Sequence, residues 1–411
     1  MSGERTNGPT AHRRAVLAGV LAAGPVHAVA AKASTRVLAP SILDLRNDFP
    51  IIGNGRTFLN AAYITPIPRQ VAAATAAFAE AKATRPMEVG ELMRGCERVR
   101  GQFARLINAS PDEVGLLFST AEGENVVANG LELKPGDNVV IDDLHYDTEF
   151  VLYRRLEKTH GIQLRIAHNR GGAVEAKDFE PLIDDRTRLV SVAWISHRNG
   201  FRHDMRALCD LAHARGALVY TDAIQAVGTV AVDVKAADVD FLCAGGYKWL
   251  LAGWGVAPFY VRRALSQRLA LDRYGEFHAD HELPDGDFQI DATARRFDYS
   301  SRAFGEAHAL SAGLTYLEGV GVPRIELHTV GLALELQKGL SAQGHRLATP
   351  MGNRSPIVAF ETAQSMDNVR AAFAAAKVDV TVRAGRVRIA PALFNTQDDI
   401  ARCLAVTRGL T

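Results

Sequence analysis

The stretch that decides the fold is residues 188–261, RLVSVAWISHRNGFRHDMRALCDLAHARGALVYTDAIQAVGTVAVDVKAADVDFLCAGGYKWLLAGWGVAPFYV. In this stretch, short apolar runs that suit buried strands alternate with helical segments, and the same rhythm begins earlier in the chain. The β-like runs are Val114–Phe118, Asn138–Ile141, Ile162–Ile166, Leu189–Trp194, Ala217–Tyr220, Phe241–Cys243 and Val256–Val261. They predict an α/β fold with a mostly parallel seven-stranded sheet and helices on both faces. Ligands of such sheets bind at the carboxyl ends of the strands.

Helical patterns flank the predicted sheet. Residues 71–81 and 91–107 precede it, and two amphipathic helices over 307–320 and 324–343 follow it. Beyond them come a strand, a helix, the hairpin-like VTVRAGRVRIAP and a last helix capped at Asn395-Thr396. We therefore predict a large domain over 41–305 with an N-terminal arm at 41–70, and a smaller α+β domain over 306–411.

The first forty residues have a different character. Residues 12–31, HRRAVLAGVLAAGPVHAVAA, show paired arginines, an apolar run and a small-x-small triplet, which is the order of a secretory signal. Arg13-Arg14 favours the twin-arginine variety, and hence export to the periplasm or medium. The alternatives are a weakly helical or disordered extension and a cytoplasmic protein. The apolar run is too short to be a membrane anchor.

The amino-acid composition argues against several classes of function. Of 411 residues, 47 are Lys or Arg and 46 are Asp or Glu, so a net charge of +1 argues against nucleic acid as a partner. The four cysteines are widely separated and form neither a disulfide framework nor a metal-ligand pair. We therefore predict no metal site.

Four chemical features follow predicted strands. Asp222 ends one buried strand, and Lys248 follows another after two glycines. The turn before the helix at Thr120 offers free backbone N–H groups that suit a phosphate, and Tyr146 brings an aromatic ring to the same edge. Taken singly, these residues also fit ordinary structural roles: helix caps, a solvated lysine and a ring packed under a loop. Together they call for a phosphate, a flat ring with a basic nitrogen, and an aldehyde, all of which pyridoxal phosphate has.

Residues 188–261 resemble the core of the class V, fold-type I pyridoxal phosphate enzymes. This group includes cysteine desulfurases, kynureninases, isopenicillin N epimerase-like proteins and aminotransferases. In weaker form the resemblance extends from about Phe58 to the C-terminus. It implies the fold-type I architecture, pyridoxal 5'-phosphate as cofactor, an amino-acid substrate and a homodimer.

The resemblance also implies roles for single residues. It makes Lys248 the Schiff-base lysine, Asp222 the partner of the pyridine nitrogen and Tyr146 the ring that stacks on the cofactor, with His145 as its rival. The other residues that it places at the cofactor are Thr120, Ala121, His197, Gln225, Tyr247 and, across a dimer interface, Ser301. Arg388 matches the arginine that binds the substrate carboxylate, and Arg383 and Arg386 are the alternatives if the register differs.

Departures from the family pattern bear on the reaction. Gly245 and Ala121 stand where many members carry a phosphate-binding hydroxyl, and no cysteine lies between Cys243 and Cys403. Desulfuration through a cysteine nucleophile is therefore disfavoured. We expect an isopenicillin N epimerase-like enzyme or a class V aminotransferase, with a kynureninase-like enzyme or a C–S β-lyase as the alternative. A third reading is a protein that binds pyridoxal phosphate without turnover.

Overall fold

The computed structural model describes residue 42 and residues 44–282 and 284–410. The predicted leader lies outside these residues and stays a prediction. The described chain belongs to one compact unit, residues 39–411. No helix in the described part of the chain is long and apolar enough to cross a membrane.

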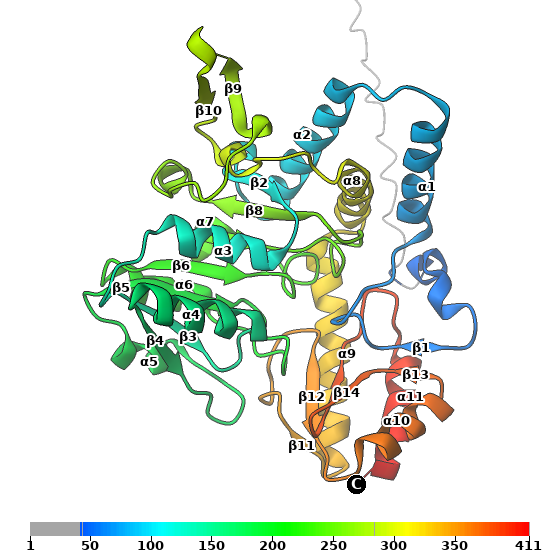
Figure 1. Cartoon of the computed structure of the whole chain (residues 1–411). Helices are drawn as coiled ribbons and strands as arrows, with labels where there is room; N and C mark the ends of the chain where they lie inside the picture. The colour runs from blue at the N-terminus through cyan, green and yellow to red at the C-terminus, as the bar shows by residue number, and fades with distance from the viewer. Residues whose placement is uncertain (1–41, 43, 283, 411) are drawn as a thin grey trace, which may run out of the picture. The chain divides into compact units, whose positions relative to one another are not determined.

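A seven-stranded sheet forms the centre of the structure (Figure 1). Its strands are β2 Val114–Leu117, β3 Asn138–Asp142, β4 Gln163–Ala167, β5 Thr187–Ala193, β6 Leu218–Asp222, β7 Phe241–Cys243 and β8 Ala257–Val261, in the order β2-β8-β7-β6-β5-β3-β4. All seven predicted runs are therefore strands of one sheet. The sheet is mixed, because β8 runs antiparallel to both β7 and β2.

Helices cover both faces of the sheet, as predicted. Val219 and Leu242 point into a core shared with α2 Val89–Leu106, α6 Met205–His213 and α8 Phe304–Val320, whereas their neighbours Tyr220 and Phe241 point into a second core under α3 Thr120–Gly130 and α4 Asp147–His160. This alternation buries both faces of each strand, which explains the nearly continuous apolar runs. The remaining short helices here are α5 Ala176–Phe179 and α7 Val234–Ala237.

The C-terminal part contains a four-stranded antiparallel sheet. Its strands, in spatial order, are β11 Arg346–Leu347, β12 Val358–Glu361, β15 Arg386–Ile389 and β14 Thr381–Arg383, and its helices are α9 Val322–Ala342, α10 Met366–Ala375 and α11 Gln397–Thr407. The predicted hairpin is β14–β15, closed by Ala384 and Gly385 with φ of 51° and 75°. Two consecutive positive φ values are what a tight two-residue hairpin turn requires. Thr396 caps α11, as predicted.

The N-terminal arm joins the C-terminal part. After helical turns at Asp44–Asp48 and Pro50–Ile52, β1 Thr57–Phe58 pairs in parallel with β13 Val378–Asp379, and α1 Arg69–Thr84 then leads into α2. Chain ends far apart in sequence thus share backbone hydrogen bonds. The predicted domain boundary at 305/306 stays a prediction.

The structure also contains elements that the sequence analysis did not predict. A hairpin of β9 Ala279–Glu282 and β10 Phe288–Ile290 follows the large sheet. Short 3-10 turns lie at Pro111–Glu113, Glu180–Leu182, Arg263–Leu265, Glu276–His278, Pro284–Gly286, Ala294–Phe297 and Arg408–Leu410.

Candidate active site

Two adjoining cavities open at the carboxyl ends of the central strands. The smaller, of about 120 Å³, is lined by Thr120, Ala121, Asp222, Gln225 and other residues. The larger, of about 480 Å³, is lined by the N-terminal arm, the loop after β5 and the hairpin β14–β15. The residues that line both cavities are Tyr146, His197, Tyr247 and Lys248. The structure therefore places the predicted site residues around these two cavities, except His145 and Ser301, which line neither.

Lys248 lies at the junction of the two cavities. It follows β7 and the turn Ala244-Gly245-Gly246, and only 8% of its surface is exposed. Burial lowers the pKa of its ammonium to about 8, because a charged group loses its hydration. Lys248 is thus not a solvated loop residue, and its neutral form, which is nucleophilic and basic, is far more populated near physiological pH than that of an ordinary lysine.

Asp222 is the last residue of β6 and is 5% exposed. Its Oδ1 accepts a hydrogen bond of 2.9 Å from the backbone N–H of Ile224, and Oδ2 has no hydrogen-bond partner in the described part of the chain. Burial raises the pKa of this carboxyl group. A buried carboxylate in this position calls for a cationic partner.

The start of α3 lines the smaller cavity. Ser119 is the N-cap, and its Oγ accepts from the backbone N–H of Glu122 at 3.2 Å. The hydroxyl of Thr120 instead accepts from the backbone N–H of Gly245 at 2.9 Å and keeps its own hydrogen to donate. A Cβ at Gly245 would lie 3.2 Å from that oxygen and 3.1 Å from Ile224, so a larger residue would crowd the site.

Tyr146, rather than His145, faces the cavities. Tyr146 is 42% exposed, and its ring centroid lies 4.9 Å from that of His197. His145 is fully buried: its Nδ1 accepts from the backbone N–H of Tyr146 at 2.8 Å, and its Nε2 lies 3.0 Å from the hydroxyl of Ser191. The expected register at this strand end therefore agrees with the geometry.

Three further predicted residues lie around Lys248. Burial lowers the pKa of His197 to about 2, so its imidazole is neutral, and burial raises the pKa of Tyr247 to about 12. Gln225 donates from Nε2 to the backbone oxygen of Ala62 at 2.9 Å and accepts from Trp249 Nε1 at 2.7 Å. The amide of Gln225 therefore ties the N-terminal arm to the site, a contact that the sequence did not predict.

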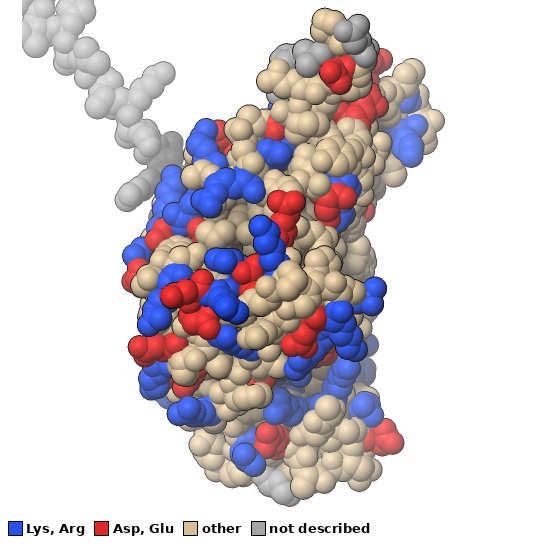
Figure 2. Space-filling view, turned by 60° about the vertical axis from the view of Figure 1, so that its left-hand side comes forward, with Lys and Arg blue, Asp and Glu red and all other residues tan. Residues whose placement is uncertain are grey.

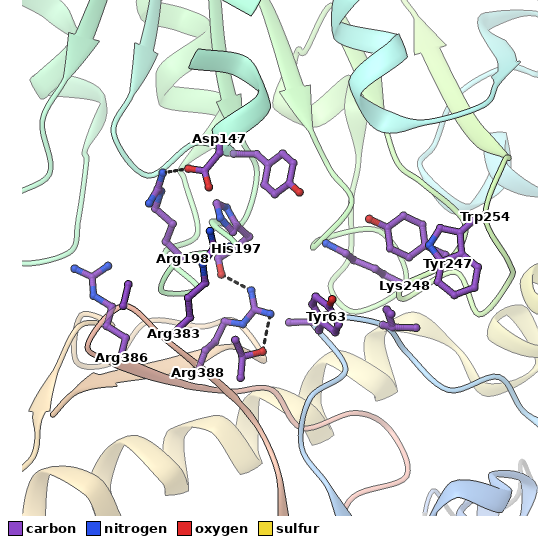
Figure 3. A pocket seen from close by; sticks show the side chains of 15 residues that line it. Tyr63, Asp147, His197, Arg198, Tyr247, Lys248, Trp254, Arg383, Arg386 and Arg388 are labelled. Atoms are coloured by element: carbon purple, nitrogen blue, oxygen red, sulfur yellow. Dashed lines mark hydrogen bonds and ion pairs between the residues drawn. The ribbon is translucent and has the colours of Figure 1, made fainter. Parts of the chain in front are cut away.

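Arg388 projects into the larger cavity from β15 (Figure 3). Its neighbours Val387 and Ile389 are fully buried on the opposite face, as the alternation of the strand predicts. Arg388 donates from Nη1 to the backbone oxygen of His197 at 2.6 Å and from Nη2 to Thr381 Oγ1 at 3.2 Å. Burial lowers its pKa to about 10, so it is charged at neutral pH.

Other residues at the site were missed by sequence reasoning. Tyr63 comes from the arm, Arg198 directly follows His197, and Trp254 stacks on Tyr247 with ring centroids 5.6 Å apart. Glu149 lies one helical turn after Tyr146 and is almost fully buried. In the sequence, only Arg198 and Glu149 could have been suspected as site residues, because they lie close to His197 and Tyr146, which were predicted.

Glu149 faces a second buried acid, Glu124. Burial and the proximity of Glu124 raise the pKa of Glu149 well above its ordinary value. Glu124 Oε1 accepts from Tyr153 at 2.7 Å and from Ser191 at 2.5 Å. Glu124 Oε2 lies 3.7 Å from His145 Nε2, and in the described part of the chain neither this atom nor Glu149 Oε2 has a hydrogen-bond partner. One proton shared between the two carboxyl groups would satisfy both orphaned oxygens.

Comparison with known proteins identifies the family to which the chain is similar. The model of the class V aminotransferase family matches residues 57–401. A probable cysteine desulfurase of Methanothermobacter thermautotrophicus is 30% identical over 305 residues, 73% of this chain and 76% of that protein. The structure resembles an apo cysteine desulfurase of Thermococcus onnurineus (TM-score 0.82, 23% identity, 89% and 97% of the two chains). It also resembles the cystine C–S lyase C-DES in complex with cysteine persulfide (TM-score 0.81, 16% identity, 88% and 99%).

Proposed function

We propose, from the premise that this chain belongs to the class V aminotransferase family of pyridoxal-phosphate-dependent enzymes, that it acts at the α carbon of an amino acid as an epimerase or an aminotransferase. One observation carries the proposal. In the described part of the chain, the cavity residues include the buried Lys248 and the half-buried Arg388, whose guanidinium suits a carboxylate, but no cysteine. The site thus has the means to move a proton at the α carbon and lacks a thiol to attack a substrate sulfur.

Pyridoxal phosphate fits the residues of the smaller cavity. A protonated ring nitrogen at Asp222 would supply a cationic hydrogen-bond donor to this buried carboxylate, whose Oδ1 already accepts from the backbone N–H of Ile224. The Thr120 hydroxyl and the free N–H groups at the start of the 11-residue helix α3 suit the phosphate, and Tyr146 supplies a ring face. When bound, the cofactor withdraws electrons from the α carbon of the substrate.

Two residues of the chain then have separate roles, one in substrate binding and one in proton transfer. Arg388 holds the substrate carboxylate through two parallel N–H groups, and its bonds to His197 and Thr381 fix its orientation beforehand. Lys248, with its pKa lowered to about 8, takes the proton from the α carbon as a general base. Proton delivery to the opposite face of the α carbon by a second donor would give epimerisation, whereas transamination would require Lys248 to pass its proton to the cofactor instead.

The state of the cysteines supports this choice over desulfuration. All four are buried, and burial raises the pKa of Cys96 to about 11 and that of Cys403 to about 12. Cys243 lies in β7, inside the core. The hairpin β14–β15, which borders the larger cavity, turns at Ala384 and Gly385 and contains no cysteine.

A C–S β-lyase is the second candidate, because the fold resembles that of the cystine C–S lyase C-DES. Loss of a β substituent after proton removal by Lys248 needs no thiol. A kynureninase-like reaction and a non-catalytic protein rank lower; the latter is disfavoured by the presence of both Lys248 and Asp222 at the cavity.

Incubation of the holoenzyme with a panel of amino acids in D₂O tests the proposal. An epimerase would incorporate deuterium at the α carbon and invert it, an aminotransferase would release an oxo acid, and a lyase would release pyruvate or another β-elimination product. Conversion of cysteine to alanine with a persulfide on the protein would overturn the proposal. Cofactor absorbance that no amino acid perturbs would favour the non-catalytic alternative.

We further propose that the working unit is a homodimer that Ser301 helps to complete. Ser301 is exposed, precedes α8 and lines neither cavity of its own chain. The proposed phosphate position at the start of α3 is poor in hydroxyl groups, since the hydroxyl of Ser119 caps the helix. A partner subunit's hydroxyl would supply what one chain lacks.

A further inference from the structure

The larger cavity carries an excess of positive charge. Its ionic lining residues are Arg198, Arg383, Arg386, Arg388, Lys248 and a single acid, Asp147. The excess is local: the whole chain has a net charge of +1, and Figure 2 shows basic and acidic side chains interspersed over the face that it draws. A cavity lined mainly by one sign of charge concentrates ligands of the opposite sign.

Three of the arginines come from one face of the hairpin β14–β15. Thr381 is paired with Arg388, and Arg383 is paired with Arg386. Residues directly opposite in an antiparallel pair share a face, as do residues two apart in a strand. The polar residues of the hairpin therefore face the cavity together (Figure 3).

The pairing of Arg383 with Arg386 sets two like charges directly across the strands, an arrangement that is destabilising on its own. Arg386 has partial compensation, since its Nη2 lies 3.5 Å from Glu361 Oε1. Arg383 has no hydrogen-bond or ion-pair partner in the described part of the chain. An anion between the two guanidinium groups would remove the repulsion.

The other two arginines are already engaged. Arg198 forms an ion pair with Asp147 and donates from Nε to the backbone oxygen of His145 at 3.2 Å. Arg388 is held by His197 and Thr381 and takes the α-carboxylate under the proposed function. The cofactor phosphate does not account for Arg383, because the smaller cavity contains none of the four arginines.

We propose that Arg383, with Arg386 across the hairpin, binds a second anionic group on the substrate, so that the substrate is an acidic amino acid. This inference rests on the proposed function in one respect, the assignment of the α-carboxylate to Arg388. Arg386 and Arg388 lie two residues apart on β15, a spacing of ~7 Å along the strand. The hairpin thus offers two separate anion-binding positions, one for each end of a dicarboxylic amino acid.

The test compares ligands that differ in one charge. Affinities of the holoenzyme for aspartate, glutamate and 2-aminohexanedioate are measured against those for asparagine and glutamine through the change in cofactor absorbance. We expect at least one acid of the series to bind about tenfold or more tightly than its neutral counterparts, as a charge-assisted contact predicts. Arg383→Gln should remove most of this difference. Arg402→Gln, an exposed arginine on α11 outside both cavities, is the matched control.

A second measurement does not depend on turnover. Calorimetry with glutarate and pentanoate, two amine-free acids of equal chain length, should show tighter binding of the dicarboxylate, and Arg383→Gln should abolish the preference. Equal binding of the acids and their neutral counterparts in both experiments would overturn the inference and leave the proposed function standing. If no amino acid perturbs the cofactor while glutarate still binds through Arg383, the proposed function fails and the anion site remains.

Discussion

Arg388 Nη1 donates a hydrogen bond of 2.6 Å to the backbone oxygen of His197 and thereby connects the C-terminal hairpin to the loop after β5. The same guanidinium donates from Nη2 to Thr381 Oγ1 at 3.2 Å. A side chain held at two points is preorganised, so little of its binding energy is lost in ordering. The proposed carboxylate-binding site is thus assembled from the hairpin β14–β15 and the loop after β5 before the substrate arrives.

Arg388→Lys should weaken the binding of L-alanine by about tenfold to a few hundredfold, because one ammonium cannot reproduce the bidentate fork. Alanine has a single carboxylate and separates this effect from that of Arg383. The absorbance of the bound cofactor without amino acid should stay unchanged. Unaltered alanine binding in Arg388→Lys would show that another arginine holds the α-carboxylate.

Lys248→Ala should abolish turnover and covalent attachment of the cofactor, while pyridoxal phosphate still binds non-covalently near Thr120 and Asp222. Borohydride reduction followed by mass spectrometry of the tryptic peptides measures the attachment. Lys235→Ala, at an exposed lysine in α7, is the control and should keep the labelled peptide. A reducible adduct in the Lys248→Ala protein would refute the assignment.

The contribution of Lys248 to the stability of the apoprotein should become more favourable as the pH rises from about 8 towards 10. Burial lowers the pKa of Lys248 from an ordinary 10.5 to about 8, so in this window the unfolded chain binds more protons than the folded one. At pH 7 folding must either remove the proton from Lys248 or bury its charged ammonium, at a cost of up to about 3 kcal/mol. Lys248→Met should therefore raise the free energy of unfolding of the apoprotein at pH 7, and the difference from the wild type should shrink as the pH rises above 8. Parallel pH profiles of both proteins in urea denaturation would contradict this.

Local patterns predicted much of the fold and the candidate site. The apolar runs were sufficient to place all seven strands, and the residues at their ends, Asp222 and Lys248, meet at one cavity. Strand direction is not encoded in an apolar run, so the antiparallel course of β8 was missed. Tyr63 was missed because the pairing of β1 with β13, which positions the arm, spans more than three hundred residues.

Hybrid dimers test the proposed role of Ser301. If Ser301 completes the partner's phosphate site, Lys248→Ala subunits and Ser301→Trp subunits are each inactive alone, but mixing them should restore one intact site in every mixed dimer. Up to about half of the wild-type activity per mixed dimer is then expected, since one site of two is whole. Sedimentation velocity checks the assembly. A fully active monomer, or no recovery in mixed dimers of confirmed composition, would rule out the proposal.

Glu149→Gln should stabilise the holoenzyme at pH 8 more than at pH 5. In the folded protein, burial and the neighbouring Glu124 raise the pKa of Glu149 above its ordinary value of 4.5, so the folded state retains a proton that the unfolded state releases above that value. The free energy of unfolding therefore falls as the pH rises from 4.5, by at most about 1.4 kcal/mol per pH unit. An amide at this position has no proton to lose and donates an N–H group to Glu124, so the variant escapes this loss.

The difference in thermal midpoint between variant and wild type, taken at both pH values, measures the effect. Glu180→Gln, at an exposed glutamate, should show no such difference. A Glu149→Gln protein that is less stable than wild type at pH 8 would mean that Glu149 is ionised in the folded state and that the two acids share no proton.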